Sequence, residues 1–241
     1  NWHTNQTTAA LSRLSSGSKL LAPQDDAAGL ALATRMEAAD RQLAATQNNL
    51  ANAISYSQTQ NGYLAGAQSV LDRMGELAIR AQDGTLSEDQ RTLYAQEFHA
   101  LKDVFNDART ARYNEANLFD GSQLQVPLSP ESGSVGAGSV DLFTPELNAL
   151  TANETALDTT TAAQNAMAFI TEAGEHVANA LARVGTSLNG LAMAQEQIAT
   201  QRATLAKSVS RIQDTDVAAS VTGLTKQRLM TENSIFALNQ S

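Results

Sequence analysis

Three histidines and their acidic neighbours are the groups in this sequence most suited to metal or acid-base chemistry. His3, His99 and His176 could act as metal ligands or general bases, but none stands in a His-Glu-x-x-His spacing. Glu97 and Glu175 lie two and one residues before the nearest histidine, so neither pair shares one face of a helix. We therefore expect surface histidines, with no metal and no catalytic residue among them.

Two short motifs could bind ligands, and both have simpler interpretations. Asp25 and Asp26 are adjacent carboxylates, which is too few ligands for calcium, and acidic residues favour the start of a helix. Gly133, Gly136 and Gly138 are not followed by the Lys-Ser/Thr of a phosphate-binding loop, which indicates a flexible connector. No cofactor is expected.

Composition excludes several classes of protein. The 241 residues include 16 basic and 25 acidic ones, and this net charge of −9 argues against nucleic acid as a general partner. The absence of cysteine excludes disulfides, thiolate zinc sites and thiol nucleophiles. No stretch of about 18 apolar residues is present, so no membrane insertion is expected.

A seven-residue repeat predicts one long helix over residues 27–82. Its first row consists of Met36, Leu43, Leu50, Ser57, Leu64, Leu71 and Ala78. Its second row, three places on, consists of Ala39, Thr46, Ala53, Gln60, Ala67 and Met74. Because the second row is small or polar, partner helices can approach closely, but the seam is not a self-sufficient zipper.

A similar repeat predicts a second long helix near the other end. It consists of Val177, Val184, Leu191, Ile198, Leu205 and Ile212, with Leu181, Leu188 and Val209 four places on. Gln195 and Arg202 interrupt the second row and should meet solvent or a polar contact. The two long helices are expected to pair side by side.

Between these helices the pattern changes twice. Asp83-Gly84 should end the first helix, and Ser87 and Gln90 form a capping box that begins a helix through about residue 110. The apolar face of this helix is expected at Leu93, Ala100, Leu101, Val104 and Ala108. Prolines, glycines and serines over residues 117–152 predict turns with a small hairpin.

These elements predict a mainly α fold, an elongated antiparallel bundle of long helices with a short irregular or β-hairpin insertion. Residues 1–118 and 161–241 would be the two halves of one rod domain, and residues 119–160 a short variable region between them.

Three stretches resemble bacterial flagellins. Residues 14–33, LSSGSKLLAPQDDAAGLALA, resemble the N-terminal signature of that family. Residues 71–80, LDRMGELAIR, and residues 208–216, SVSRIQDTD, are similar to two further flagellin segments and stand in the same order. The resemblance covers roughly residues 5–120 and 165–241, which makes it far more specific than one short motif.

The resemblance implies a structural, non-enzymatic subunit that self-assembles into the extracellular flagellar filament for motility. Its implied partners are other flagellin subunits, hook-associated and cap proteins, and an export chaperone. Both terminal helices would be cut short, so the chain should fold but polymerise poorly. The resemblance assigns subunit packing to the following residues: Asp25, Asp26, Gly29, Arg211, Asp214 and Asp216.

The resemblance also implies a patch for vertebrate Toll-like receptor 5 at Arg73, Leu77 and Glu97. Gly75 stands where the family segment has a second arginine, which removes one charge and lowers helix propensity by ~1 kcal/mol. In the simpler interpretation Leu77 packs inside the bundle and the arginine pairs with acidic neighbours at helical spacing.

Two alternative functions are consistent with the same helical pattern. A hook-filament junction protein shares the two-ended helical bundle, although the segments at residues 25–29 and 211–216 favour flagellin. A flagellin-like cell-surface protein could hold a surface polysaccharide, for which a local basic patch is available at Lys207, Arg211, Lys226 and Arg228. A metalloprotease in the variable region is disfavoured because the zinc motif is missing.

Overall fold

The computed structural model describes residues 2–128, 133–152 and 155–240, and side chains from residue 7 to residue 232 within those ranges. The chain divides into two compact units. Unit 1 comprises residues 1–45 and 198–241, and unit 2 comprises residues 46–197. In the described ranges, no helix is both long enough and apolar enough to cross a membrane.

The fold is mainly helical, as the sequence predicts. Its helices in chain order are α1 (Trp2–Ser16), α2 (Ala27–Ala81), α3 (Glu88–Arg109), α4 (Pro145–Thr151), α5 (Thr160–Gln213) and α6 (Val217–Gln240). The predicted helix over residues 27–82 is confirmed, and it ends just before Asp83-Gly84. The second long helix begins earlier than its heptad pattern, at Thr160.

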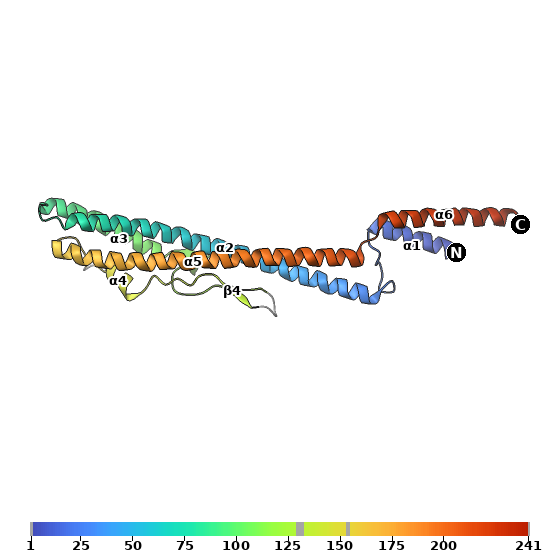
Figure 1. The fold of residues 1–241 in the computed structure, drawn as a ribbon, viewed down its shortest axis with the longest axis horizontal. Coiled ribbons are helices and arrows are strands. Elements are labelled where there is room, and N and C mark those ends of the chain that lie inside the picture. The colour runs from blue at the N-terminus through green and yellow to red at the C-terminus, as the bar shows by residue number, and fades with distance from the viewer. Residues whose placement is uncertain (1, 129–132, 153–154, 241) are drawn as a thin grey trace. The chain divides into compact units, whose positions relative to one another are not determined.

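In unit 2, α2 lies antiparallel to α5 along the predicted seam (Figure 1). The α2 side of this seam is fully buried and includes two polar residues, Ser57 and Gln60. Its apolar members are Leu50, Ala53, Leu64, Ala67, Leu71, Met74 and Ala78. From α5, Val177, Val184 and Leu191 are buried to the same degree. Small residues alternate with larger ones, so the helices approach closely without a bulky core.

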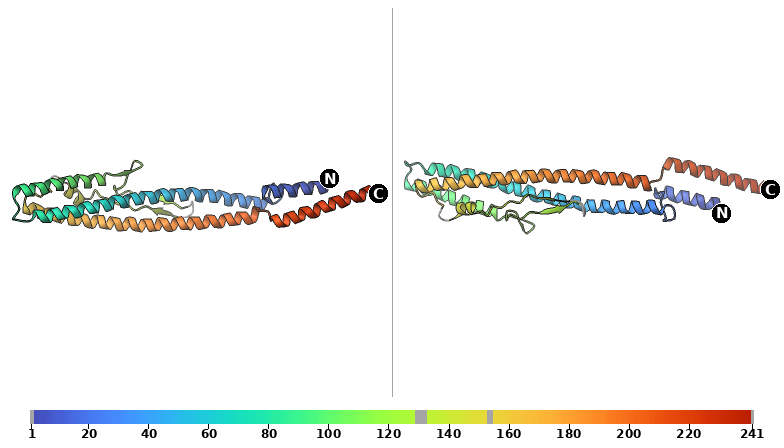
Figure 2. Two further views of the ribbon diagram at one scale, coloured as in Figure 1. Left: turned by 90° about the horizontal axis from the view of Figure 1, so that it is seen from above. Right: turned by 60° about the horizontal axis from the view of Figure 1, so that its bottom comes forward.

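In unit 1, residues 27–45 of α2 lie beside residues 198–213 of α5, and α1 lies beside α6 (Figure 2). Polar contacts supplement a less buried seam here. Arg202 Nε donates to Asp40 Oδ1 at 2.9 Å, and Gln213 Nε2 donates to Glu37 Oε1 at 2.9 Å. The Arg202 hydrogen bond lowers the pKa of Asp40. The predicted polar contact of Arg202 is therefore confirmed.

The capping box of α3 is confirmed, but its predicted apolar face is wrong. Ser87 accepts a hydrogen bond from the Gln90 amide, and the Gln90 side chain accepts one from the Ser87 amide. Of the predicted face, Leu93 is 64% exposed and Val104 is 52% exposed. The buried face consists of Ala95, Phe98, Lys102, Phe105 and Arg109. Two large aromatic rings and two cationic side chains thus replace the aliphatic stripe.

Two short hairpins follow α3. Strands β1 (Arg112–Tyr113) and β2 (Ala116–Asn117) pair antiparallel, and β3 (Gln125–Pro127) pairs antiparallel with β4 (Ser134–Gly136). The β3–β4 hairpin confirms the one expected within residues 117–152. The β1–β2 hairpin is not anticipated by the sequence, because its two-residue turn lacks the usual glycine.

That turn contains a backbone conformation that ordinary side chains disfavour. Asn114 has a φ of 46° and Glu115 has a φ of 67°, the pattern of a tight hairpin turn that favours Asn-Gly. We expect Glu115→Gly to raise the free energy of unfolding by about 0.5–1 kcal/mol, because relief of left-handed strain exceeds the lost backbone entropy. Urea denaturation measures the gain. Glu115→Ala keeps the Cβ atom, so an equal gain in that variant would contradict this explanation.

Candidate functional site

The connections between the long helices and the terminal helices pair with each other in unit 1. We call residues 17–26 and 214–216 the joint. The Lys19 amide donates to Gln213 O at 2.7 Å, and the Thr215 amide donates to Gly17 O at 2.9 Å. Gly17 adopts a φ of 72° directly after α1, a common helix ending for glycine. These backbone bonds hold the early and late connections against each other.

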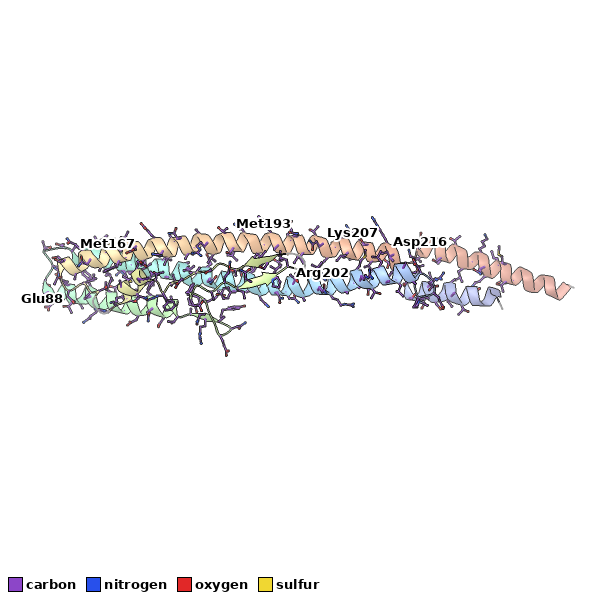
Figure 3. The ribbon with its side chains drawn as sticks, turned by 90° about the horizontal axis from the view of Figure 1, so that it is seen from below. Glu88, Met167, Met193, Arg202, Lys207 and Asp216 are labelled. Atoms are coloured by element: carbon purple, nitrogen blue, oxygen red, sulfur yellow. The ribbon has the colours of Figure 1, made fainter. Side chains whose placement is uncertain are left out.

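An aspartate caps the helix on each side of the joint. Asp26 Oδ1 accepts from the Gly29 amide at 2.9 Å at the start of α2. Asp216 Oδ1 accepts from the Ala219 amide at 3.0 Å at the start of α6 (Figure 3). Each carboxylate satisfies an amide that has no partner within its helix and opposes the positive end of the helix dipole. A Cβ atom on Gly29 would lie 2.4 Å from Asp26 Oδ2, so this capping geometry requires glycine.

Asp25 organises the turn that precedes α2. Its Oδ2 atom accepts from the Leu21 and Ala22 amides, each at 3.0 Å, and its Oδ1 atom accepts from Arg13 at 2.8 Å. The Ala22 and Leu21 hydrogen bonds, followed by that of Arg13, lower the pKa of Asp25. The Asp25 carboxylate therefore connects α1 to the turn in its ionised form.

This pKa shift predicts an acid-sensitive turn. The folded-state pKa lies below the ordinary value of 3.8, so the stabilisation is complete above that value and is lost as the pH falls through the folded-state pKa. We expect the Leu21 and Ala22 amides to lose hydrogen-exchange protection over that acidic interval. Asp25→Asn keeps an acceptor oxygen but cannot titrate. Equal pH dependence in that variant would show that another group is responsible.

The structure brings the six residues predicted for subunit packing to the joint or its immediate neighbours. Asp25, Asp26, Gly29 and Asp216 make the contacts described above. The Arg211 carbonyl accepts from Lys19 Nζ at 3.0 Å, and the Asp214 carboxylate accepts from the Ser210 hydroxyl. Their contacts described here lie within the chain, so their role toward a neighbouring subunit stays a prediction.

The three residues of the predicted receptor patch lie in unit 2, with one of them buried. Arg73 Nε donates to Glu97 Oε1 at 2.7 Å, and Arg73 Nη1 donates to Glu76 Oε2 at 2.8 Å. Both pairs are exposed, and such pairs contribute little to stability. Leu77 is fully buried. The exposed part of this patch is therefore polar.

The other candidate motifs form no site in the described part of the chain. No group of three or more His, Asp or Glu residues there could hold a metal ion. His99 is exposed and His176 is half-buried, while the side chain of His3 lies outside the described residues. Gly136 ends β4, and Gly133 and Gly138 flank that strand, which places the glycine cluster in a hairpin.

Two buried cations of α3 are not predicted by the sequence. Lys102 Nζ donates to Thr155 O at 2.9 Å and to Ala152 O. Arg109 donates to Leu142 O at 2.7 Å and to side-chain oxygens of Asn148 and Thr151. Burial lowers the pKa of both groups, and neither is in an ion pair with a described residue. They fasten residues 142–152 and Thr155 to α3 through neutral oxygen atoms.

The fold and the joint define a class of protein: a helical structural protein in which segments from both ends of the chain pair. Residues 2–124 match the bacterial flagellin N-terminal helical region, and residues 167–241 match the bacterial flagellin C-terminal helical region. The chain belongs to the bacterial flagellins. It is therefore a non-enzymatic subunit of the extracellular flagellar filament, which assembles with other flagellin subunits.

Similar proteins agree with this assignment. The flagellin of Listeria monocytogenes is 32% identical, over 97% of this chain and 88% of the relative. The flagellin of Halalkalibacterium halodurans is 30% identical, over 98% of this chain and 88% of the relative. A crystal structure of Bacillus cereus flagellin matches with a TM-score of 0.55 at 23% identity, covering 63% of this chain and 88% of that one.

The fold is also shared with a putative flagellar hook-associated protein from Vibrio parahaemolyticus. That structure matches with a TM-score of 0.68 at 15% identity, covering 79% of this chain and 100% of that one. At this identity the match supports the fold alone.

Proposed function

We propose that the joint is a place where this flagellin contacts neighbouring subunits of the filament. Asp25, Asp26, Gly29 and Asp216 fix its backbone through the hydrogen bonds described above. Around them, Leu21 is 45% exposed and Val217 is 57% exposed. A rigid joint with exposed apolar side chains can bind a neighbour without first becoming ordered, which lowers the cost of association. This combination is the observation that carries the proposal.

Incorporation of labelled chains onto sheared filaments of the same flagellin tests this proposal. The variant with Asp26→Ala and Asp216→Ala loses both caps, and we expect its incorporation to fall at least tenfold. The matched variant with Asp26→Asn and Asp216→Asn keeps an acceptor oxygen at each cap and should incorporate close to the unmodified chain. Normal incorporation of the alanine variant would overturn the proposal. A loss of far-UV helical signal would instead report misfolding, so circular dichroism accompanies the assay.

We propose the remaining partners from the family resemblance. They are hook-associated and cap proteins at the ends of the filament, an export chaperone, Toll-like receptor 5 and surface glycans. The variable segment of residues 119–160, between the two halves of the rod domain, would carry contacts particular to this flagellin. Titration calorimetry with purified surface glycans tests the glycan contact. A titration that gives no heat signal at millimolar glycan would contradict this contact.

Receptor recognition can be tested at Gly75. Gly75 is buried, and a Cβ atom added there would meet Ile170 Cγ2 at 3.8 Å, an ordinary contact, so the first carbon of a longer side chain clashes with nothing. If Arg73, Leu77 and Glu97 form the receptor patch, Gly75→Arg should strengthen signalling in cells that express Toll-like receptor 5, and Arg73→Ala should weaken it. Unchanged receptor signalling in both variants would argue against this patch.

A further inference from the structure

Two asparagine–glycine pairs lie within the long helices of unit 2. Asn61-Gly62 stands in α2, and Asn189-Gly190 stands in α5. Both asparagines are exposed. This dipeptide is typical of tight hairpin turns, and glycine weakens a helix relative to alanine. The helical structure itself therefore gives no reason for either pair.

Packing does not explain the two glycines either. A Cβ atom added at Gly62 or at Gly190 would meet no atom within 4 Å. By contrast, a Cβ atom added at Gly138 would lie 3.1 Å from Ser187 Oγ, a close approach that favours glycine. What the missing side chain changes at Gly62 and Gly190 is the chemistry of the preceding asparagine, because no Cβ atom shields the glycine amide nitrogen.

An asparagine followed by glycine can lose ammonia without an enzyme, and asparagine is among the thermolabile residues of proteins. The glycine amide nitrogen loses its proton and attacks the asparagine Cγ atom. A new N–Cγ bond closes a succinimide ring, the Cγ–Nδ2 bond breaks, and the leaving nitrogen takes up a proton from solvent and departs as ammonia. Water then opens the ring at one of its two carbonyl carbons, which gives either aspartate or isoaspartate.

The folded helices prevent this ring closure. The glycine amides at positions 62 and 190 lie in helical interiors, where an amide donates to the carbonyl four residues earlier. A helical ψ of about −42° also directs the following nitrogen away from the side chain of the asparagine. Ring closure requires a rotation of ψ that breaks the helix at that residue. The reaction is therefore open where the chain is unfolded and closed where the helix is intact.

Isoaspartate at either site would disturb the register of a long helix, because it adds one atom to the main chain. Asn61 stands between Gln60 and Leu64, which are both fully buried in the seam. Asn189 stands two residues before Leu191, which is also fully buried. An added main-chain atom interrupts the helical hydrogen bonds and rotates the residues after it relative to those before it. The two parts of each heptad row can then no longer face the partner helix together.

We propose that Asn61 and Asn189 are deamidation sites that the folded helices close and the unfolded chain opens. Isoaspartate at either site keeps the long helices from regaining their register, so modification in the unfolded state is retained as a loss of folding. Each chain thus carries a chemical record of the time that it has spent unfolded. The inference concerns the single chain and depends neither on the joint nor on contacts between subunits.

Peptide mass spectrometry of the full chain tests the inference after incubation in mildly alkaline buffer, with and without guanidinium chloride. Deamidation replaces an amide NH₂ by OH and raises the peptide mass by about 1 Da. We expect Asn61 and Asn189 to react at least tenfold faster in denaturant than in buffer. Asn52 and Asn179 precede alanine, so they should react at least tenfold more slowly in denaturant. Equal rates with and without denaturant, or equal rates at all four asparagines, would overturn the inference.

Two matched variants test the effect on folding by the far-UV circular dichroism that returns after denaturant is removed. The variant with Gly62→Ala and Gly190→Ala shields both amides, and it should refold fully after an incubation that costs the unmodified chain its helical signal. The variant with Asn61→Asp and Asn189→Asp adds the charges without the extra main-chain atoms, and it should refold when fresh. Full refolding of chains that contain isoaspartate would overturn the register argument, and so would an equal loss in the aspartate variant.

Discussion

Replacing Arg109 by alanine is expected to lower the free energy of unfolding by about 3–5 kcal/mol. Arg109 is 3% exposed, its guanidinium group donates to three oxygens, and its Cζ atom lies 4.8 Å from the ring centroid of Phe143. Its removal leaves the Leu142 carbonyl and the side chains of Asn148 and Thr151 without their donor. Leu142 is buried, so its unsatisfied carbonyl costs about 1–3 kcal/mol, whereas Asn148 is exposed and Thr151 is half-buried. Lost packing of the long Arg109 side chain adds to this cost, so the total exceeds that of a typical surface change.

Urea denaturation of the variant measures this loss, and hydrogen exchange locates it. The amides of α4 should lose protection before those of α2 and α5, because Arg109 fastens that helix to α3. Arg112→Ala is the matched control, since Arg112 is exposed and donates to Asn117 Oδ1 at 3.0 Å. A loss at Arg109 no larger than that at Arg112 would mean that water satisfies the three oxygens.

Phe105→Ala is expected to cost about 3–5 kcal/mol, the usual penalty for removing a buried aromatic ring. Phe105 is fully buried on α3, one turn from Lys102 and one turn from Arg109. Truncation leaves a cavity beneath two charged groups whose geometry depends on close packing. The remaining cations hold the helix in place, so the cavity cannot close fully.

The adjacent residue provides the control for this prediction. Val104 is 52% exposed, and Val104→Ala should change the free energy of unfolding by less than about 0.5 kcal/mol. Thermal unfolding of both variants decides between the two faces of α3. A larger loss at Val104 than at Phe105 would restore the aliphatic face that the sequence predicts.

Periodic and local features of the fold could be predicted from the sequence. The heptad rows from Leu50 to Ala78 and from Val177 to Leu191 are buried as predicted. In a long helix the buried positions recur at a fixed spacing, and this spacing can be recognised directly in the sequence. The capping box of Ser87 and the helix start after Asp26 depend on neighbours a few residues away. The flagellin segments allowed the family to be identified from the same local order.

Features that depend on distant partners could not be predicted in this way. The sequence predicts the wrong face of α3 because hydropathy ranks lysine and arginine as exposed residues, whereas Lys102 and Arg109 are buried. Long cationic side chains can be buried when enough oxygen atoms surround them. Here those oxygens belong to residues 142–152 and to Thr155, which only the folded chain brings to α3.

The same distinction between local and long-range features applies to the candidate site. The sequence by itself indicated that the acidic pair Asp25-Asp26 begins α2, because capping is a contact between residues three positions apart. The matching cap of α6 by Asp216 was not predicted. Only the tertiary structure decided that Gly17 and Lys19 pair with Thr215 and Gln213, and that Leu77 is buried. Those outcomes depend on which surfaces come into contact after the chain folds back on itself. These contacts join residues that are far apart in the sequence, so the order of residues alone does not reveal them.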